Sequence, residues 1–235
     1  GRRKQNTRRL WGLDCNCKSI MKDLLKVIKT VASEIDEAIV MFSTGKDSIV
    51  TLDLCCKFIP DIKIVHLYFV PGLSYRERFL EYYSKRYNIK IEQYPQVDVS
   101  RILHNNTFSN SQKKIDKLKQ ADIELFLRKT YDISYLAYGY RKQESLQRRG
   151  HLSSCDGFEK KFKRFFPVAD WSTNDIFNYI KKEKLPLPVE YSYGFRDINF
   201  FEGKSLVWLY NNYPEDYQKV KNIYPFIEAE LLRCL

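Results

Sequence analysis

The segment that most constrains this chain passes from an apolar, strand-forming stretch through a small turn into an apolar helix. Residues 38–42 read Ala-Ile-Val-Met-Phe, residues 43–48 read Ser-Thr-Gly-Lys-Asp-Ser, and a helical apolar pattern follows to about residue 58. The first N–H groups of a helix have no partner within the helix, and the helix dipole makes that end positive. The segment therefore predicts a phosphate site at the turn.

Two well-known phosphate loops do not fit this turn. The Walker A pattern fails because Val40 and Asp47 occupy its first glycine and its final hydroxyl position. The dinucleotide fingerprint Gly-x-Gly-x-x-Gly is absent from this region too. The turn instead resembles the pyrophosphate-binding loop (PP-loop) of the adenine-nucleotide α-hydrolases. An ordinary turn in which Ser43 or Asp47 caps the helix is the alternative interpretation.

The side chains of the turn suit an anion. Gly45 permits an unusual backbone conformation or a close approach, and Lys46 adds a positive charge. Asp47 would repel phosphate unless it binds Mg²⁺ or caps the helix, so we predict a mixed role for it. The hydroxyl donors of the turn are Ser43, Thr44 and Ser48.

Length and composition predict a globular chain. With 235 residues, 44% hydrophobic and 15% aromatic, one domain with a small appendage is expected. We expect a basic N-terminal arm at 1–18, a nucleotide-binding α/β domain at 19–198 and a C-terminal helical extension at 199–235. No apolar stretch approaches the roughly 20 residues of a membrane span. A cytoplasmic location is the expectation.

The cysteines predict no metal cluster. They lie at 15, 17, 55, 56, 155 and 234, without the paired Cys-x-x-Cys motifs of a zinc ribbon. Reduced, mostly buried thiols are expected, as suits a cytosolic protein.

The charge balance is strongly basic. Lys and Arg outnumber Asp and Glu by 40 to 29, which gives a net charge of +11. Such a field attracts nucleotides, nucleic acid or acidic lipid, and a merely solvated basic surface is the alternative. Positive residues gather at 2–9, 160–164 and 181–184, so nucleic acid stays among the partners to test.

Strands and helices alternate along the first part of the chain. Strands are predicted through residue 42 and at 63–70, 89–94 and 132–140, and helices at 19–36, from the 43–48 loop to about 58, at 74–87 and 111–130, and from 173. This alternation predicts an α/β fold with a mostly parallel sheet and helices on both faces. Ligands of such sheets bind at the carboxyl ends of the strands. The turn at 43–48 and the segment after residue 140 should therefore share one crevice.

That later segment is rich in cations. Residues 139–149 read Gly-Tyr-Arg-Lys-Gln-Glu-Ser-Leu-Gln-Arg-Arg, which predicts an anion clamp beside a strand end. A solvated basic turn is the alternative. Further on, Ser172-x-x-Asp175 predicts a capped helix start, followed by Leu-Pro at 185–186 and Tyr-x-x-Gly-Phe at 191–195.

The order of these motifs over residues 38–195 resembles the phosphoadenylyl-sulfate (PAPS) reductase family. The resemblance implies a Rossmann-like (HUP-type) fold and an adenine nucleotide as ligand. It implies that Arg141, Arg148 and Arg149 grip the terminal anionic part, and that His66 and Tyr68 line the adenine side. It also assigns nucleotide binding to a set of motif residues, which are Ser43, Thr44, Gly45, Lys46, Asp47, Ser48 and Gly139.

One departure from this family concerns chemistry. Sulfonucleotide reductases carry a C-terminal Glu-Cys-Gly-x-His segment, whereas residues 230–235 read Glu-Leu-Leu-Arg-Cys-Leu. We expect Cys234 to be incidental and not a nucleophile on a mobile tail. The iron–sulfur type is not expected either, because Cys55 and Cys56 lie in the wrong place and only Cys155 falls near the required region.

The resulting hypothesis is an enzyme that cleaves ATP between its α- and β-phosphates, with ATP and Mg²⁺ as cofactors and Asp47 as the metal ligand. Lys46, Asp47, Arg141 and Arg148 are the predicted catalytic set, because charge develops on the departing pyrophosphate. One alternative is a sulfonucleotide reductase. The other is a non-catalytic module that senses a nucleotide while its surface binds nucleic acid or a partner protein.

Overall fold

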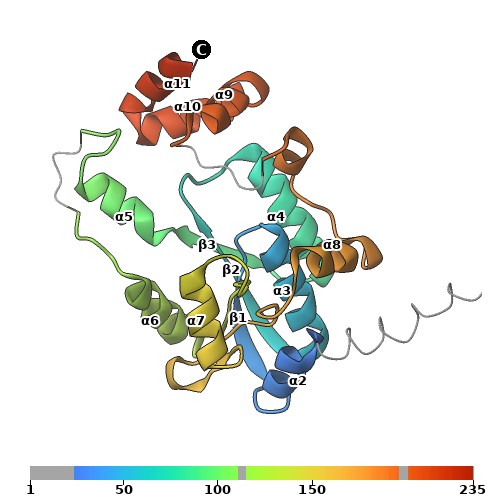
Figure 1. Ribbon diagram of the computed structural model, residues 1–235. Coiled ribbons are helices and arrows are strands. Elements are labelled where there is room, and N and C mark those ends of the chain that lie inside the picture. Colours follow the sequence, from blue (N-terminus) through green and yellow to red (C-terminus); the bar gives the residue numbers. More distant parts are fainter. Residues whose placement is uncertain (1–23, 111–114, 196–200, 235) are drawn as a thin grey trace, which may run out of the picture.

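A computed structural model describes residues 24–110, 115–195 and 201–234. Within these ranges, six strands form one sheet in the order β3-β2-β1-β4-β6-β5 (Figure 1). The strands that run parallel are β1 (Glu37–Met41), β2 (Asp61–Tyr68), β3 (Ile91–Pro95), β4 (Leu136–Ala137) and β6 (Arg164–Phe165). At one edge, β5 (Phe158–Glu159) pairs antiparallel with β6. The mostly parallel sheet that the alternation predicts is thus confirmed.

Strand β1 is central and covered on both sides. Its Val40 pairs with Ile64 of β2 and with Ala137 of β4. Val40 belongs to one buried cluster, whereas its neighbours Ile39 and Met41 belong to another. Successive side chains of a strand point to opposite faces, so a strand buried on both faces must be apolar without interruption. This explains the uninterrupted run at 38–42.

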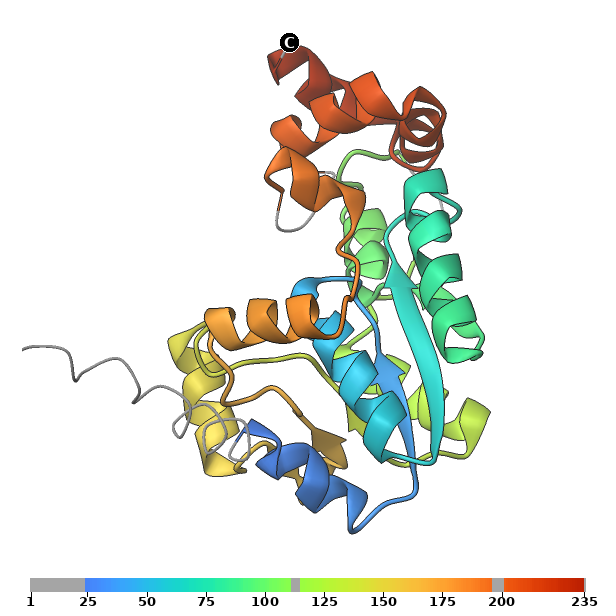
Figure 2. The same ribbon diagram turned by 90° about the vertical axis from the view of Figure 1, so that its right-hand side faces the viewer.

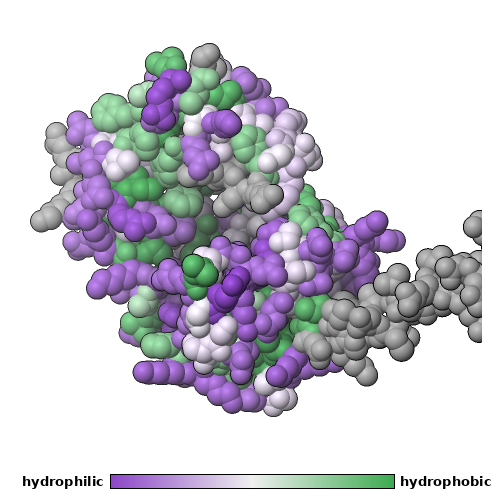
Figure 3. Space-filling model, in the orientation of Figure 1, coloured by the Kyte–Doolittle hydropathy of each residue, from purple (hydrophilic) through white to green (hydrophobic). Residues whose placement is uncertain are grey.

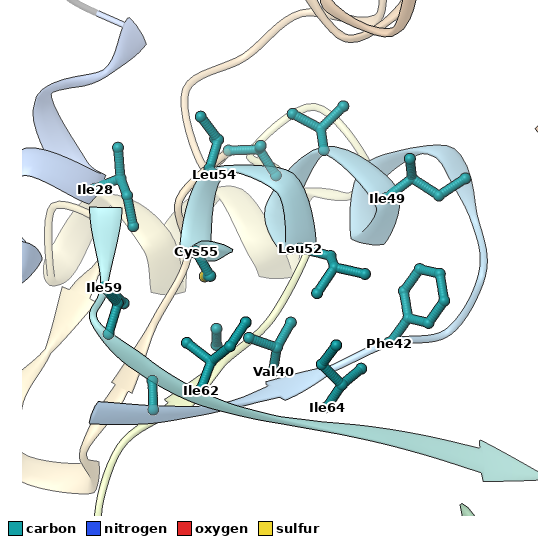
Figure 4. Close-up of a cluster of buried hydrophobic side chains, with 14 of the residues drawn as sticks. Ile28, Val40, Phe42, Ile49, Leu52, Leu54, Cys55, Ile59, Ile62 and Ile64 are labelled. Carbon is teal, nitrogen blue, oxygen red and sulfur yellow. The ribbon is translucent and has the colours of Figure 1, made fainter. Parts of the chain in front are cut away.

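Helices cover the first face of the sheet. They are α2 (Lys26–Ala32), α3 (Lys46–Phe58), α4 (Ser74–Tyr87) and α8 (Thr173–Lys182), and all contribute to one hydrophobic cluster. Figure 4 shows Leu52 and Cys55 of α3 directed toward Val40 and Ile62 of the strands. Because α3 is anchored there, its first turn is fixed against the carboxyl end of β1.

The second face is covered by α6 (Gln120–Tyr131) and α7 (Leu146–Ser154). Leu127 of α6 and Leu152 of α7 are fully buried in a cluster with Ile39 and Leu136. Helices on both faces are therefore confirmed. The short α5 (Val97–His104), which the sequence did not predict, follows β3 directly and is capped by Gln96, whose side chain accepts from Asp98 N–H at 3.2 Å.

The C-terminal helices have a core of their own. These helices are α9 (Gly203–Asn212), α10 (Pro214–Ile223) and α11 (Glu228–Cys234), which Figures 1 and 2 place at one end of the molecule. Trp208 and Tyr224 are buried there together with Val70 and Leu73, which follow β2. This extension therefore packs on the segment that leads from β2 into α4.

Several predicted elements differ in extent. The predicted helix 19–36 corresponds to α2, and its first residues lie outside the described part of the chain, as do the basic arm at 1–18 and the cluster at 2–9. Residues 111–114 of the predicted helix at 111–130 lie outside the described part of the chain, residues 115–119 are not helical, and α6 begins at Gln120. The predicted strand at 132–140 has two paired residues. Strand β4 is held by its pairing with neighbouring strands at Ile39 and Phe165. Its own sequence therefore gives only a weak signal for where the strand begins and ends.

The face of the molecule shown in Figure 3 carries both hydrophilic and hydrophobic residues, and the two kinds are interspersed. No helix in the described part of the chain combines the length and the apolar character that a bilayer crossing requires.

Candidate functional site

The loop at residues 43–48 joins β1 to α3 with an unusual backbone at Thr44. Thr44 has φ +68°, the left-handed conformation that a threonine rarely adopts, and its side chain is buried. Gly45 has an ordinary φ of −72° and is the residue before the first helical position. The expectation that Gly45 supplies the unusual conformation is therefore wrong, because Thr44 turns the chain instead.

The helix begins without a side-chain cap. Neither Ser43 nor Asp47 accepts a hydrogen bond from the first N–H groups of α3, so the capping interpretation is wrong. Ser43 Oγ donates to Ser48 Oγ at 3.1 Å, and Ser48 Oγ donates to the Gly45 carbonyl at 2.9 Å. These bonds hold the loop while they leave the first-turn amides to other partners.

Asp47 lies between two cations. Lys46 Nζ is 2.5 Å from Asp47 Oδ2, and Arg141 Nε is 2.7 Å from Asp47 Oδ1. The second contact is an ion pair that lacks the alignment of a hydrogen bond. The Arg141 side chain is only 5% exposed, and its Nη1 donates to the Trp171 carbonyl at 3.3 Å. Arg141 is thus a buried partner of the loop.

A magnesium ion held by protein side chains alone does not fit the described residues. Both carboxylate oxygens of Asp47 are engaged by cations. Among the described residues, no group of three or more His, Cys, Asp or Glu side chains is placed to hold a metal. Magnesium can reach such a site on the phosphates of a nucleotide, since it needs only one or two protein ligands there.

Gly139 connects the two halves of the site. It follows β4, and a Cβ built on it would lie 2.8 Å from the Ser48 backbone nitrogen. Any side chain would therefore force the strand end and the helix start apart. We predicted that the 43–48 loop and the segment after residue 140 share one crevice. At this contact the loop meets the residue that follows β4 and leads into that segment.

A cavity of about 500 Å³ opens in front of the loop. Its apolar lining comes from the strand ends and includes Met41, Val65, Leu67 and Tyr138. Its polar lining includes Ser43, Gly45, Lys46, Asp47, Ser48, Gln96, Gln120, Glu144, Arg148 and Tyr191. A pocket with one apolar end and a few convergent polar groups is typical of a ligand site of this size.

Arg148 and Arg149, the two neighbouring arginines of the predicted anion clamp, differ in whether they line the cavity. Arg148 lines the cavity, lies over the Tyr140 ring at 4.0 Å from its centroid and pairs with Glu144. Burial raises the pKa of Tyr140, although the Arg148 charge opposes that shift. Arg149 is exposed and does not line the cavity.

His66 and Tyr68 line a second cavity of about 540 Å³. Its lining shares Ser43, Leu67 and Gln96 with the first cavity, so the two adjoin. His66 Nδ1 donates to the Phe42 carbonyl at 2.8 Å, because a carbonyl can only accept. Burial lowers the pKa of His66 to about 4, and this imidazole is therefore neutral at physiological pH.

Arg76 and Tyr191 also contact the loop from distant segments, and of these only Tyr191 belongs to a motif noted in the sequence. Arg76 of α4 donates to Thr44 Oγ1 and forms an ion pair with buried Glu190 at 2.9 Å. Tyr191 Oη accepts a hydrogen bond from Lys46 N–H at 3.2 Å. No local pattern distinguishes Arg76 from the other arginines, whereas the Tyr-x-x-Gly-Phe motif could have identified Tyr191.

The four cysteines within the described residues do not line either cavity. Burial raises the pKa of the Cys55 and Cys155 thiols, which disfavours the reactive thiolate. Cys234 lies in the last turn of α11, and its Sγ would be 2.0 Å from a Cβ built on Gly203. Its sulfur therefore packs against α9 within the C-terminal helices.

Comparisons with known proteins point to one family. The family model described as phosphoadenosine phosphosulfate reductase domain matches residues 37–199. Sulfate adenylyltransferase subunit 2 of Agrobacterium fabrum is 26% identical over 207 residues, covering 77% of this chain and 65% of that protein. An uncharacterised protein of Methanocaldococcus jannaschii is 24% identical over 232 residues, covering 94% of this chain and 52% of that protein. This chain thus spans less than two thirds of each relative's length.

Among solved structures, phosphoadenylyl-sulfate reductase from Candida auris, in its phosphate complex, matches with a TM-score of 0.53. The two chains are 12% identical, and the match covers 83% of this chain and 97% of that chain. At this identity the likeness shows the fold, and it confirms the predicted Rossmann-like architecture.

Proposed function

Because this chain belongs to the phosphoadenosine phosphosulfate reductase domain family, we propose that it binds ATP at the 43–48 loop and cleaves it between the α- and β-phosphates. One observation carries the proposal. The amino end of α3 has no side-chain cap, and Gly139 packs against its backbone. This end of the helix faces a cavity of about 500 Å³ with an apolar end. This combination suits a ligand with a phosphate group at one end and a base at the other.

The orientation of the nucleotide follows from the lining. The adenine would lie against the apolar strand ends at Met41, Val65 and Leu67. The phosphates would then lie over the loop, where Lys46 and Ser48 line the cavity and would exchange their present hydrogen-bond partners for phosphate oxygens. The second cavity adjoins at Ser43 and Leu67, and we assign it to the acceptor of the adenylyl group.

The chemistry is a substitution at the α-phosphorus. An acceptor oxygen forms a new bond to this phosphorus while the bond to the bridging oxygen breaks, and the electron pair leaves with pyrophosphate. Lys46, Arg148 and the amides of α3 would stabilise that developing charge. Arg141 would act through Asp47, as a positioning residue, because it is buried behind the loop. Any magnesium would come with the phosphates, and no step is assigned to it.

A partner protein is part of this proposal. The relative from Agrobacterium fabrum is named as one subunit of an adenylyltransferase, and the adenylyl transfer proposed here also needs an acceptor. The alternative of a sulfonucleotide reductase is less well supported, because Cys234 packs against Gly203 in the C-terminal helices.

A single-turnover incubation with α-phosphate-labelled ATP and Mg²⁺ tests the proposal. AMP or an adenylylated acceptor is the expected product, and Lys46→Gln should slow its formation about a hundredfold. Lys63→Gln, at an exposed lysine of β2, is the matched control and should leave the rate unchanged. ADP as the only product would refute cleavage at the α-phosphate. Failure of the folded protein to bind ATP would refute the nucleotide site itself.

A further inference from the structure

A tyrosine from outside the 43–48 loop is bonded to one of its phosphate-facing amides. Lys46 N–H donates to Tyr191 Oη at 3.2 Å, and Tyr191 also lines the cavity in front of the loop. Lys46 is the first residue of α3, so its N–H has no acceptor within the helix. The hydroxyl therefore satisfies a donor that the helix itself leaves open.

The turn that carries Tyr191 is anchored at the loop. It is η2 (Val189–Tyr193), and its Glu190 is buried with only 2% of its surface exposed. Glu190 pairs with Arg76 at 2.9 Å, and Arg76 also donates to Thr44 Oγ1. A buried carboxylate bound to a cation is costly to remove, so η2 stays next to the loop.

We propose that the Tyr191 hydroxyl takes the place of a phosphate oxygen on the Lys46 amide, and that a pyrophosphate-bearing ligand displaces it. This inference rests on the proposed function of the same site. A hydrogen bond from N–H to an ionised oxygen is about twice as strong as one to a neutral oxygen. A phosphate oxygen can therefore replace the Tyr191 hydroxyl as the acceptor of the Lys46 N–H, whereas a neutral ligand cannot.

The consequence is a lower affinity for the charged part of the ligand, with no effect on the nucleoside part. A pyrophosphate-bearing ligand must break the hydrogen bond between Lys46 N–H and the Tyr191 hydroxyl before it can bind this amide, and this lowers its affinity. A nucleoside without phosphates makes no use of this amide, and its affinity does not depend on the hydroxyl. Tyr191 thus acts as a competitor in the unliganded protein and sets the affinity of the phosphate subsite.

Isothermal titration calorimetry of Tyr191→Phe tests the inference, since this variant keeps the ring and removes only the hydroxyl. The wild type and the variant are titrated with inorganic pyrophosphate, ATP and adenosine. We expect the variant to bind pyrophosphate and ATP about fivefold more tightly, which corresponds to one ordinary hydrogen bond, and adenosine equally well. Tyr193→Phe is the matched control, because Tyr193 lies in the same turn, is 55% exposed and does not line the cavity.

The outcomes separate this inference from the proposed function. Weaker or unchanged binding of pyrophosphate by Tyr191→Phe, with wild-type binding intact, would overturn the inference alone and would make Tyr191 a phosphate ligand or a bystander. Absence of pyrophosphate and ATP binding in the folded wild type would overturn both proposals. Circular dichroism of each variant verifies that the fold is retained.

Discussion

Gly139 packs directly against the backbone of Ser48. A Cβ built on Gly139 would lie 2.8 Å from the Ser48 nitrogen and 3.0 Å from the Asp47 carbonyl oxygen. These neighbours are backbone atoms of a helix start and cannot turn aside as a flexible side chain would. The end of β4 and the first turn of α3 therefore form one rigid unit, on which the candidate nucleotide site depends.

Replacing Gly139 by alanine should damage both stability and binding. The added methyl group would force the 43–48 loop away from the end of β4, at a cost of about 1–3 kcal/mol in unfolding free energy. Nucleotide affinity should fall with it. Gly150→Ala is the control, because a Cβ there meets no atom within 4 Å and Gly150 lies inside α7. That control should be neutral or slightly stabilising in urea unfolding; equal losses in both variants would contradict the close-packing argument.

The ion pair between Asp47 and Arg141 should show strong coupling. Removing Asp47 leaves the Arg141 charge buried without a carboxylate partner, and removing Arg141 leaves the Asp47 charge with Lys46 alone, since the Asp47 and Arg141 side chains are 13% and 5% exposed. We expect Asp47→Asn and Arg141→Met each to destabilise the fold by about 3 kcal/mol, and the double variant by clearly less than the sum. Urea unfolding of the four proteins gives the coupling energy. The exposed pair Glu81–Lys85, treated identically, should show little coupling, and additive effects at Asp47 and Arg141 would disprove the pairing.

Arg148 and Arg149 should differ in their effect on nucleotide binding. Arg148 lines the cavity and is held over the Tyr140 ring, whereas Arg149 is exposed outside it. Arg148→Gln should weaken ATP binding about tenfold, because a charge-assisted contact to phosphate is lost. Arg149→Gln changes the net charge equally and should leave the affinity nearly unchanged. A similar loss in both variants would mean that the general field, and not a specific contact, attracts the nucleotide.

His66 should make the fold sensitive to acid. Burial lowers its pKa to about 4 from 6.5, so the unfolded chain binds the proton more readily than the folded one. Stability is then complete above about pH 6.5 and declines as the pH falls toward 4, by about 3 kcal/mol in total. The His66→Asn variant keeps an amide that can donate to the Phe42 carbonyl but has no imidazole to protonate. Its unfolding free energy should therefore lack the decline between about pH 6.5 and 4 that His66 causes. Parallel pH profiles of unfolding free energy in both proteins would show that His66 does not titrate in this way.

The sequence predicted the central part of the fold because its signals there are local. The run at 38–42, the helix at 46–58 and the start of α8 at Ser172 each follow from neighbouring residues alone. Asp175 N–H donates to Ser172 Oγ at 3.1 Å, as the capping motif predicts. By contrast, β4, β6 and the antiparallel β5 are two residues long and exist because neighbouring strands hold them.

The sequence by itself determined that this chain has a short loop between a buried strand and a helix, because those features depend on residue order and side-chain type. It could not determine the partners of that loop. Arg76 and Tyr191 reach the loop from distant segments, and Glu190 pairs with Arg76. Asp47 pairs with Arg141, which follows β4. Only the tertiary structure brings these groups together, since burial and hydrogen-bond geometry depend on which segments pack against each other.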